Sequence, residues 1–203
     1  ILWSGRTSPQ QEKRIDKYTS LLIDKMESIV IEALKNQELM KLSWSRGAVR
    51  FGGNRRVIRD GKWSGFGFQR NGPVDHSLPV MVARDLEGNT RVVWSNYACH
   101  CTTVGGRNHI SGDWAGYANE MIESEFKSAL SLMTIGCGAD VGPQPSGGLE
   151  NAKIHGSTIA KEVKNLLGKK MIPLPGVTSI TNSVAKLPLV KSLPRKHWES
   201  QKS

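Results

Sequence analysis

Segments typical of strands and of helices alternate through the middle of the chain, and this order limits the possible folds more than any other feature. Alternating apolar residues indicate strands, whereas apolar residues spaced three or four apart indicate helices. We expect hairpin strands at 79–84 and 91–98, a helix from about 114, a buried strand at 130–135 and a helix at 149–167. This order predicts an α/β fold with a mixed β-sheet core flanked by helices. In such folds ligands bind at the C-terminal ends of strands, where we place the site.

Before this region the pattern predicts one long helix and a less regular stretch. Residues 9–36 have the apolar spacing of an amphipathic helix, with Ser8 as its N-cap and Pro9 in its first turn. Residues 47–52 are expected to form a short strand. The stretch 52–78 contains glycines but no clear periodicity, and it is long for a connector, so we interpret it as a functional loop.

The C-terminal part carries weaker signals. Residues 176–190 look strand-like, and the last ten or so residues are expected to fray. We therefore divide the chain into an α/β domain at 1–190 and a basic tail at 191–203. Asp113 is the candidate N-cap of the helix that starts near Trp114.

The composition is that of an ordinary globular protein, since 38% of the 203 residues are hydrophobic and 23% are charged. These fractions exclude a wholly disordered, collagen-like or coiled-coil chain. No apolar run approaches the roughly 20 residues that a membrane-spanning helix needs. The chain starts with Ile1, and its first eight residues show no signal peptide. We therefore expect a truncated N-terminus that carries no targeting signal.

The net charge of +10 is concentrated toward the C-terminus. Residues 161–203 contain nine basic and two acidic side chains, scattered among Pro, Ser and Thr. Nucleic-acid binding would fit a basic stripe on an ordered face better, so we expect no nucleic-acid partner. A solvated basic surface is the simplest interpretation, and attraction to an anionic membrane surface is the alternative.

Three cysteines, Cys99, Cys101 and Cys137, cannot all pair with one another, and their odd number argues against a disulfide scaffold. We expect three small buried thiols. The run Cys99-His100-Cys101 suggests a zinc site, but neighbouring residues of a strand point to opposite faces. This geometry argues against a site made from all three residues.

Several residues that could carry chemistry follow predicted strands. His100 and Asp140 both lie at such strand ends, so they can meet in space although they are far apart in the sequence. A neutral imidazole there suits a metal ligand or a general base, with a structural histidine as the alternative. The turn 136–142 can present N–H groups to an oxyanion, or it can simply be a tight glycine turn. Arg55 and Arg56 can hold a headgroup or carboxylate, or form an exposed pair.

Three segments, taken in order, resemble the N-terminal catalytic domain of neutral/alkaline non-lysosomal ceramidases. The segments are Gly53-Asn54-Arg55-Arg56 with Gly72-Pro73-Val74-Asp75, Asn96-Tyr97-Ala98-Cys99-His100-Cys101-Thr102-Thr103 with Ile110-Ser111-Gly112-Asp113-Trp114-Ala115-Gly116-Tyr117, and Gly136-Cys137-Gly138-Ala139-Asp140-Val141-Gly142-Pro143. The similarity runs from about residue 9 to 190. It implies a zinc-dependent amidase that splits N-acylsphingosine into a sphingoid base and a fatty acid.

With this resemblance each candidate residue receives a role. The expected roles are metal ligand for His100, catalytic centre for Asp140 and Gly142, and substrate binding for Arg55, Asn54, Thr102 and Thr103. The chain also departs from the family pattern. Gly142 stands where characterised ceramidases have a serine, and residues 1–5 lack the family's upstream histidines. The family's remaining ligands, a Glu and a Tyr, would lie beyond residue 203.

The resemblance therefore predicts a ceramidase-like hydrolase that cleaves a lipid amide with metal-activated water. The alternative is a degenerate relative that keeps the fold and binds a lipid or saccharide headgroup without turnover. Zinc is the cofactor expected for the complete family site, but a catalytic zinc needs three protein ligands and this chain securely offers His100, so we expect little bound metal. Peripheral membrane contact and a secreted or membrane-associated location are implied by the resemblance alone.

Overall fold

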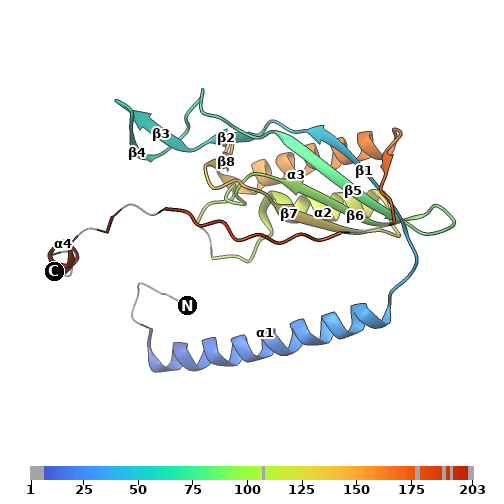
Figure 1. The fold of residues 1–203 in the computed structure, drawn as a ribbon, viewed down its shortest axis with the longest axis horizontal. Helices are drawn as coiled ribbons and strands as arrows, with labels where there is room; N and C mark the ends of the chain where they lie inside the picture. Colours follow the sequence, from blue (N-terminus) through green and yellow to red (C-terminus); the bar gives the residue numbers. More distant parts are fainter. Residues whose placement is uncertain (1–6, 107, 177–178, 189–190, 193, 201–203) are drawn as a thin grey trace.

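The computed structural model describes residues 7–106, 108–176, 179–188, 191–192 and 194–200 (Figure 1). Its elements, in chain order, are α1 (Pro9–Lys35), β1 (Lys41–Ala48), β2 (Gly52–Asn54), β3 (Arg56–Arg59), β4 (Lys62–Phe66), β5 (Ser77–Arg84), β6 (Thr90–Tyr97), α2 (Asp113–Glu125), β7 (Leu130–Ile135), β8 (Val141–Pro143), α3 (Gly148–Leu167), β9 (Ile172–Pro173) and α4 (Arg195–Glu199). A five-stranded sheet with α2 and α3 forms the main body, and α1 stands apart from it.

The main sheet is mixed. Its strand order is β7-β6-β5-β1-β9; β6 and β7 pair in parallel, and the other neighbours pair antiparallel. The chain passes from β6 to β7 through α2, because parallel neighbours need a crossover connection. Helices α2 and α3 pack against each other and cover one face of the sheet (Figure 1). The predicted α/β class is therefore confirmed, as are the β5–β6 hairpin and both helices of this layer.

The hydrophobic core lies between the sheet and this helical layer. Every second residue of β5 points into it, so Leu78, Val80 and Val82 are buried. Trp114 of α2 is fully buried and packs edge-on against Phe51 and Tyr97, with ring centroids 5.4 Å and 5.8 Å apart. These aromatic contacts join α2 to the sheet and to the segment that precedes β2.

Helix α1 begins as the sequence predicts. The Ser8 hydroxyl accepts the N–H of Gln11, and the Gln11 side chain accepts the N–H of Ser8, so two free donors of the first turn are satisfied. The apolar residues of α1 recur at helical spacing, yet no residue within its described span is buried. Among the residues that the structure describes, no helix has the length and apolar character needed to cross a bilayer.

The stretch 52–78 is more ordered than expected, and the strand expected at 47–52 is displaced. Strand β1 ends at Ala48 and β2 begins at Gly52. Within 52–78, β3 and β4 form a hairpin whose turn residues Asp60 and Gly61 have positive φ angles of 49° and 71°. Such turns match the twist of paired strands. The sequence pattern missed this hairpin because its strands are short and lack regular apolar alternation.

The strand expected at 176–190 is wrong. Within that range, the positions that the structure describes form no strand, and β9 comes earlier and pairs with β1 through Trp44 and Ser43. The short helix α4 lies in the segment expected to fray, and the fraying stays a prediction. A polar segment rich in Pro and Ser gives little periodicity from which either element could be predicted.

Asp113 is not the N-cap of α2 but its first residue, since Gly112 occupies the cap. The Asp113 carboxylate is nonetheless buried and accepts the N–H groups of Trp114 at 2.7 Å and Val104 at 2.9 Å. It therefore ties the loop after β6 to the start of the helix, which is a broader role than capping.

All three cysteines are free thiols, but Cys101 and Cys137 are exposed, so the expectation of three buried thiols is wrong for two of them. Burial raises the pKa of the Cys99 thiol to about 12. Cys101 is exposed as a residue, but desolvation of its sulfur raises the pKa of its thiol to about 11.

The thiolate is the reactive form of a cysteine. We therefore expect iodoacetamide at pH 8 to modify Cys137 first, Cys101 more slowly, and Cys99 only after unfolding. Mass spectrometry of timed samples measures this order, and equal rates for Cys99 and Cys137 would contradict it.

Candidate functional site

A small two-stranded ladder assembles the candidate site. Strand β2 pairs antiparallel with β8, so that Gly53 lies opposite Gly142 and Asn54 opposite Val141. The contact continues past the strands, where the Arg55 N–H donates to the Asp140 carbonyl oxygen at 2.7 Å. Two of the segments that carry the sequence resemblance are therefore neighbours in space although they are distant in the chain.

Tyr97, at the end of β6, fixes this ladder to the main sheet. Its hydroxyl accepts the N–H of Gly52 at 3.0 Å and donates to the Val49 carbonyl oxygen at 3.2 Å. Burial raises the pKa of Tyr97 to about 12, so the hydroxyl keeps its proton and both hydrogen bonds at neutral pH. The position of the site relative to the core therefore depends on this phenol.

Asn54, which is buried, and Asp140, which is half-buried, form the base of the site. The Asn54 amide Nδ2 donates to Asp140 Oδ2 at 3.0 Å and to the Pro73 carbonyl oxygen at 2.9 Å, while its Oδ1 accepts the Arg56 N–H at 2.9 Å. Asn54 is buried, and these bonds hold three chain segments together. The structure thus places Asp140 beside the predicted residues, with one carboxylate oxygen already engaged by an amide.

Arg55 and His100 meet above this base. Arg55 Nη2 lies 2.8 Å from His100 Nε2, and the Nε and Nη2 atoms of Arg55 donate to the Ala139 carbonyl oxygen at 3.2 Å and 3.0 Å. The Arg55 guanidinium also stacks over the Phe66 ring, 4.8 Å from its centroid. A guanidinium can only donate, so His100 Nε2 accepts and the ring proton sits on Nδ1.

Two hydrogen bonds fix the backbone of His100. Its N–H donates to the Val141 carbonyl oxygen at 3.0 Å, and its own carbonyl oxygen accepts the indole N–H of Trp114 at 2.9 Å. One bond comes from the β8 ladder and the other from the core helix α2. The backbone position of His100 is therefore held by the β8 ladder and by α2 together.

A cavity of about 390 Å³ opens beside this pair. Its lining residues are Arg55, Gly67, Phe68, Thr102, Gly142, Pro143, Gln144 and Ser146. Four of these, Gly67, Phe68, Gln144 and Ser146, were not predicted from the sequence. Phe68 is an aromatic residue inside the glycine-containing stretch 52–78, which is the one signal that could have pointed to it.

The remaining predicted residues divide between the cavity and the interior. Thr102 lines the cavity, whereas Thr103 is fully buried and its hydroxyl has no hydrogen-bond partner among the described residues. Gly142 lies in the cavity wall, and a Cβ built there would be 3.8 Å from Arg55 Cδ, an ordinary contact. The missing serine at position 142 is therefore a difference of sequence that the backbone does not require.

The residues present do not fit a complete zinc site. Within the described part of the chain, no three His, Cys, Asp or Glu residues gather closely enough to hold a metal ion. The Nε2 atom of His100 faces the Arg55 guanidinium, and one Asp140 oxygen is held by Asn54. A catalytic zinc needs three protein ligands and an open position. We therefore assign no step of chemistry to a metal held by these residues.

Comparison of the sequence with protein-family models and with curated proteins finds no match. The fold is similar to that of solved structures, among them two ceramidases. Neutral ceramidase from Pseudomonas aeruginosa has 17% identity and a TM-score of 0.55, and a ceramidase described as complexed with C2 has 18% identity and a TM-score of 0.56. The fold is ceramidase-like.

The ceramidase-like fold agrees with the sequence resemblance at the level of architecture. Each match covers 69% of this chain and 24% of the ceramidase chain, so the chain spans about a quarter of the length of either structure. At identities below one in five, the match establishes the arrangement of strands and helices. Whether this chain shares the activity of the whole ceramidases has to be argued from its site residues.

Proposed function

We propose that this protein is a ceramidase-like hydrolase of lipid amides, such as N-acylsphingosine, in which the cavity lined by Arg55, Thr102 and Gly142 binds the polar end of the substrate. The observation that carries the proposal is Arg55, which lies on the cavity wall of a ceramidase-like fold with its Nη2 atom 2.8 Å from His100 Nε2. The predicted residues Asn54 and Asp140 lie directly beneath this pair and position it.

Arg55 supplies the chemistry of recognition. Among the residues that the structure describes, its guanidinium has no carboxylate partner, and its Nη1 atom makes no hydrogen bond. Two N–H groups and a positive charge are therefore available to an oxygen atom in the cavity. The carbonyl oxygen of an amide and the carboxylate of a released fatty acid are both acceptors of this kind.

The cavity also suits an amphipathic ligand. Phe68 offers an apolar surface, while Thr102, Gln144 and Ser146 offer hydroxyl and amide groups. An N-acylsphingosine headgroup carries hydroxyls and an amide next to long apolar chains, so both surfaces find a counterpart. His100, with an unprotonated Nε2 held by Arg55, would lie at the edge of this ligand and can exchange a proton once the arginine moves to substrate.

Headgroup binding without turnover is the second candidate, and two observations favour it. Position 142 lacks the family's hydroxyl, and the described residues offer His100 without a companion set of metal ligands. In this case the same cavity and the same arginine would hold the lipid. The two candidates therefore share their binding residues and differ only in whether the bound amide is hydrolysed.

The test is binding of a short-chain N-acylsphingosine with a fluorescent acyl group, followed by fluorescence anisotropy. Arg55→Met keeps the length of the side chain but removes its donors, so we expect affinity to fall about tenfold or more. Arg56→Met is the matched control: its guanidinium also lies over Phe66, at 5.3 Å, but Arg56 is absent from the cavity wall. We expect its affinity to stay within about twofold of the wild type.

Equal losses in the two variants, or no loss in either, would contradict the proposal. Arg55 also donates to the Ala139 carbonyl oxygen, so its replacement can disturb the turn as well as the ligand. Thr102→Trp is therefore a second variant: the exposed indole would fill the cavity and should also lower the affinity. Mass spectrometry of free fatty acid in the same samples separates the candidates. Release that depends on His100 supports hydrolysis, and binding without release supports the second candidate.

A further inference from the structure

The sheet has a second face, which α2 and α3 do not cover. Strand register places its outward residues in cross-strand rows. One row is Ile172, Trp44, Met81, Trp94 and Leu132, and the next is Leu42, Ala83, Val92 and Leu130. Every member of both rows is apolar. We call these nine residues the outer face.

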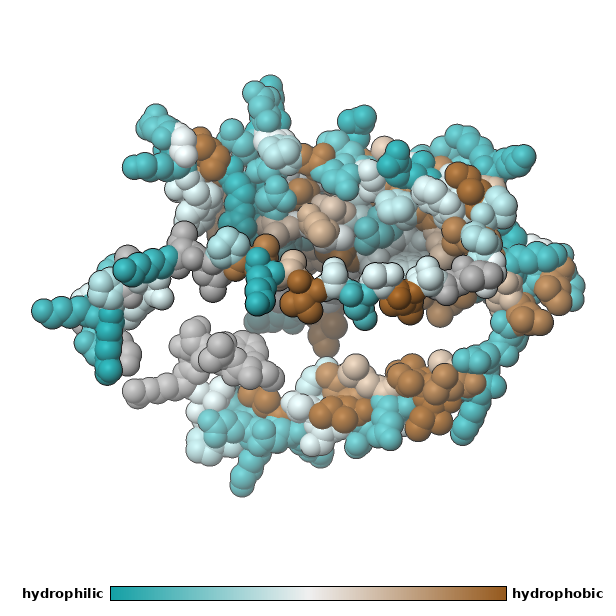
Figure 2. Space-filling view, viewed as in Figure 1, coloured by the Kyte–Doolittle hydropathy of each residue, from teal (hydrophilic) through white to brown (hydrophobic). Residues whose placement is uncertain are grey.

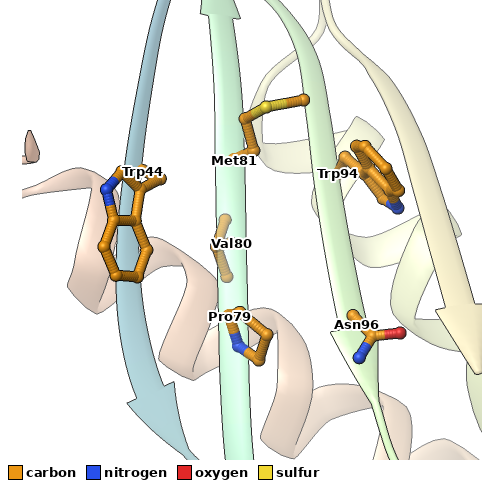
Figure 3. Close-up of a pocket in the computed structure, with 6 residues that line it drawn as sticks. All are labelled: Trp44, Pro79, Val80, Met81, Trp94 and Asn96. Atoms are coloured by element: carbon orange, nitrogen blue, oxygen red, sulfur yellow. The ribbon is translucent and has the colours of Figure 1, made fainter. Parts of the chain in front are cut away.

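The outer face is open to solvent in the structure. Trp94 is 44% exposed, Leu132 46% and Leu130 57%. A hollow of about 230 Å³ lies over the first of these rows, and its lining includes Trp44, Met81 and Trp94 (Figure 3). A mainly antiparallel sheet can leave one face in water, but a solvated face normally carries polar residues. An apolar outer face therefore indicates that another element covers it.

Helix α1 has the complementary surface. Ile15, Tyr18, Leu22, Met26, Ile29 and Ala33 form one stripe along it. Tyr18, Met26 and Ile29 are each more than half exposed, and Figure 2 shows apolar side chains gathered along this helix and open to solvent. An amphipathic helix gains most of its stability from packing this stripe against a core, which α1 lacks in the described arrangement.

The connection between the two surfaces is short. Residues 36–40 separate α1 from β1 and can span at most about 17 Å, whereas a helix packed on a sheet needs an offset of about 10 Å. Trp44 lies about 10 Å along β1 from its start. If α1 runs back over β1, Ile29 and Met26 lie about 9 and 14 Å from the helix end, directly over Trp44 and its row.

We propose that α1 folds back onto the outer face of its own chain, with Met26 and Ile29 packed into the hollow between Trp44, Met81 and Trp94. The protein then has three layers, with the sheet between α1 and the α2–α3 pair. Its own helix is favoured over that of a second copy because a five-residue tether gives a local concentration in the millimolar range or above. The inference is independent of the proposed ligand.

Disulfide trapping tests this packing in the full chain. In a background with Cys101→Ser and Cys137→Ser, the pair Met26→Cys and Met81→Cys should oxidise within one chain. The matched control is Ser28→Cys with Met81→Cys, because Ser28 lies two residues on and thus on the opposite side of α1. We expect the first pair to close at least tenfold faster under oxidised glutathione, and the product to run as a monomer without reductant.

Equal closing rates for the two pairs would overturn the proposal, because a freely moving helix presents both faces alike. Disulfides found only between chains would also overturn it, since they would assign the outer face to α1 of a second copy. Met26→Cys with Trp44→Cys gives a second reporter on a different strand if the Met81 variant fails to fold. Light scattering measures the molar mass of the unmodified chain, and we expect that of a monomer.

Discussion

Replacement of Trp114 by alanine is expected to lower the free energy of unfolding by about 3–5 kcal/mol, the range measured for large aromatic residues removed from cores. Trp114 is fully buried and contacts both Phe51 and Tyr97, so the deleted indole leaves a cavity where α2 meets the sheet. Since whole domains are stable by only about 5–15 kcal/mol, this loss is a large fraction of the total. Urea denaturation followed by circular dichroism measures it.

Trp114→Phe is the control that separates packing from hydrogen bonding. It keeps most of the apolar volume but removes the indole N–H that donates to the His100 carbonyl oxygen. We expect a smaller loss of about 1–3 kcal/mol, together with weaker binding of the lipid ligand because the His100 backbone is no longer held. A Trp114→Ala variant that loses less than about 1 kcal/mol would show that α2 does not depend on this contact.

Gly138→Ala is expected to be the most disruptive single methyl group in the site. A Cβ at Gly138 would lie 2.6 Å from the Ala98 carbonyl carbon and 2.6 Å from the Cys99 nitrogen, and both are backbone atoms that cannot rotate away. The turn must therefore move, which we expect to cost about 1–3 kcal/mol or more of unfolding free energy. The movement also displaces the neighbouring Ala139 carbonyl, which anchors Arg55, so ligand affinity should fall as well.

Gly142→Ala, four residues later in the same turn, is the matched control. Its new methyl group would meet Arg55 Cδ at 3.8 Å, an ordinary contact, and its backbone does not have a positive φ. We expect the unfolding free energy to stay the same or rise by up to about 1 kcal/mol, because alanine restricts the unfolded chain. If thermal melting ranks the two variants in the opposite order, the packing of the turn against residues 98 and 99 is not as described.

Local patterns were sufficient to predict the fold class and its main hairpin and helices. The β5–β6 hairpin consists of two strand-like apolar runs on either side of a turn-rich segment, α2 and α3 have helical spacing, and Ser8 carries a capping signal, so each of these elements follows from its own residues. The long-range pairing of β2 with β8 could not be predicted in this way. Strands of three residues have no measurable periodicity, and the pairing depends on contacts such as Tyr97 to Gly52.

The candidate site shows the same division. Arg55, His100, Asp140 and Gly142 were singled out as individual residues, and the structure brings them together. Their partners were not predictable, because the bond from Arg55 to His100 depends on where two separate segments cross. Thr103 shows the converse: its position beside Thr102 suggested a binding role, but its side chain is fully buried in the interior.

Among the residues that the structure describes, Arg55 has no carboxylate partner, and this has a practical consequence for work with this protein. A guanidinium without a carboxylate neighbour attracts any small oxyanion in the buffer, and phosphate or sulfate offers it better acceptors than an amide carbonyl does. Such anions would compete for the cavity and mask a lipid of modest affinity. Purification and assay in chloride or organic sulfonate buffers would avoid this competition for Arg55.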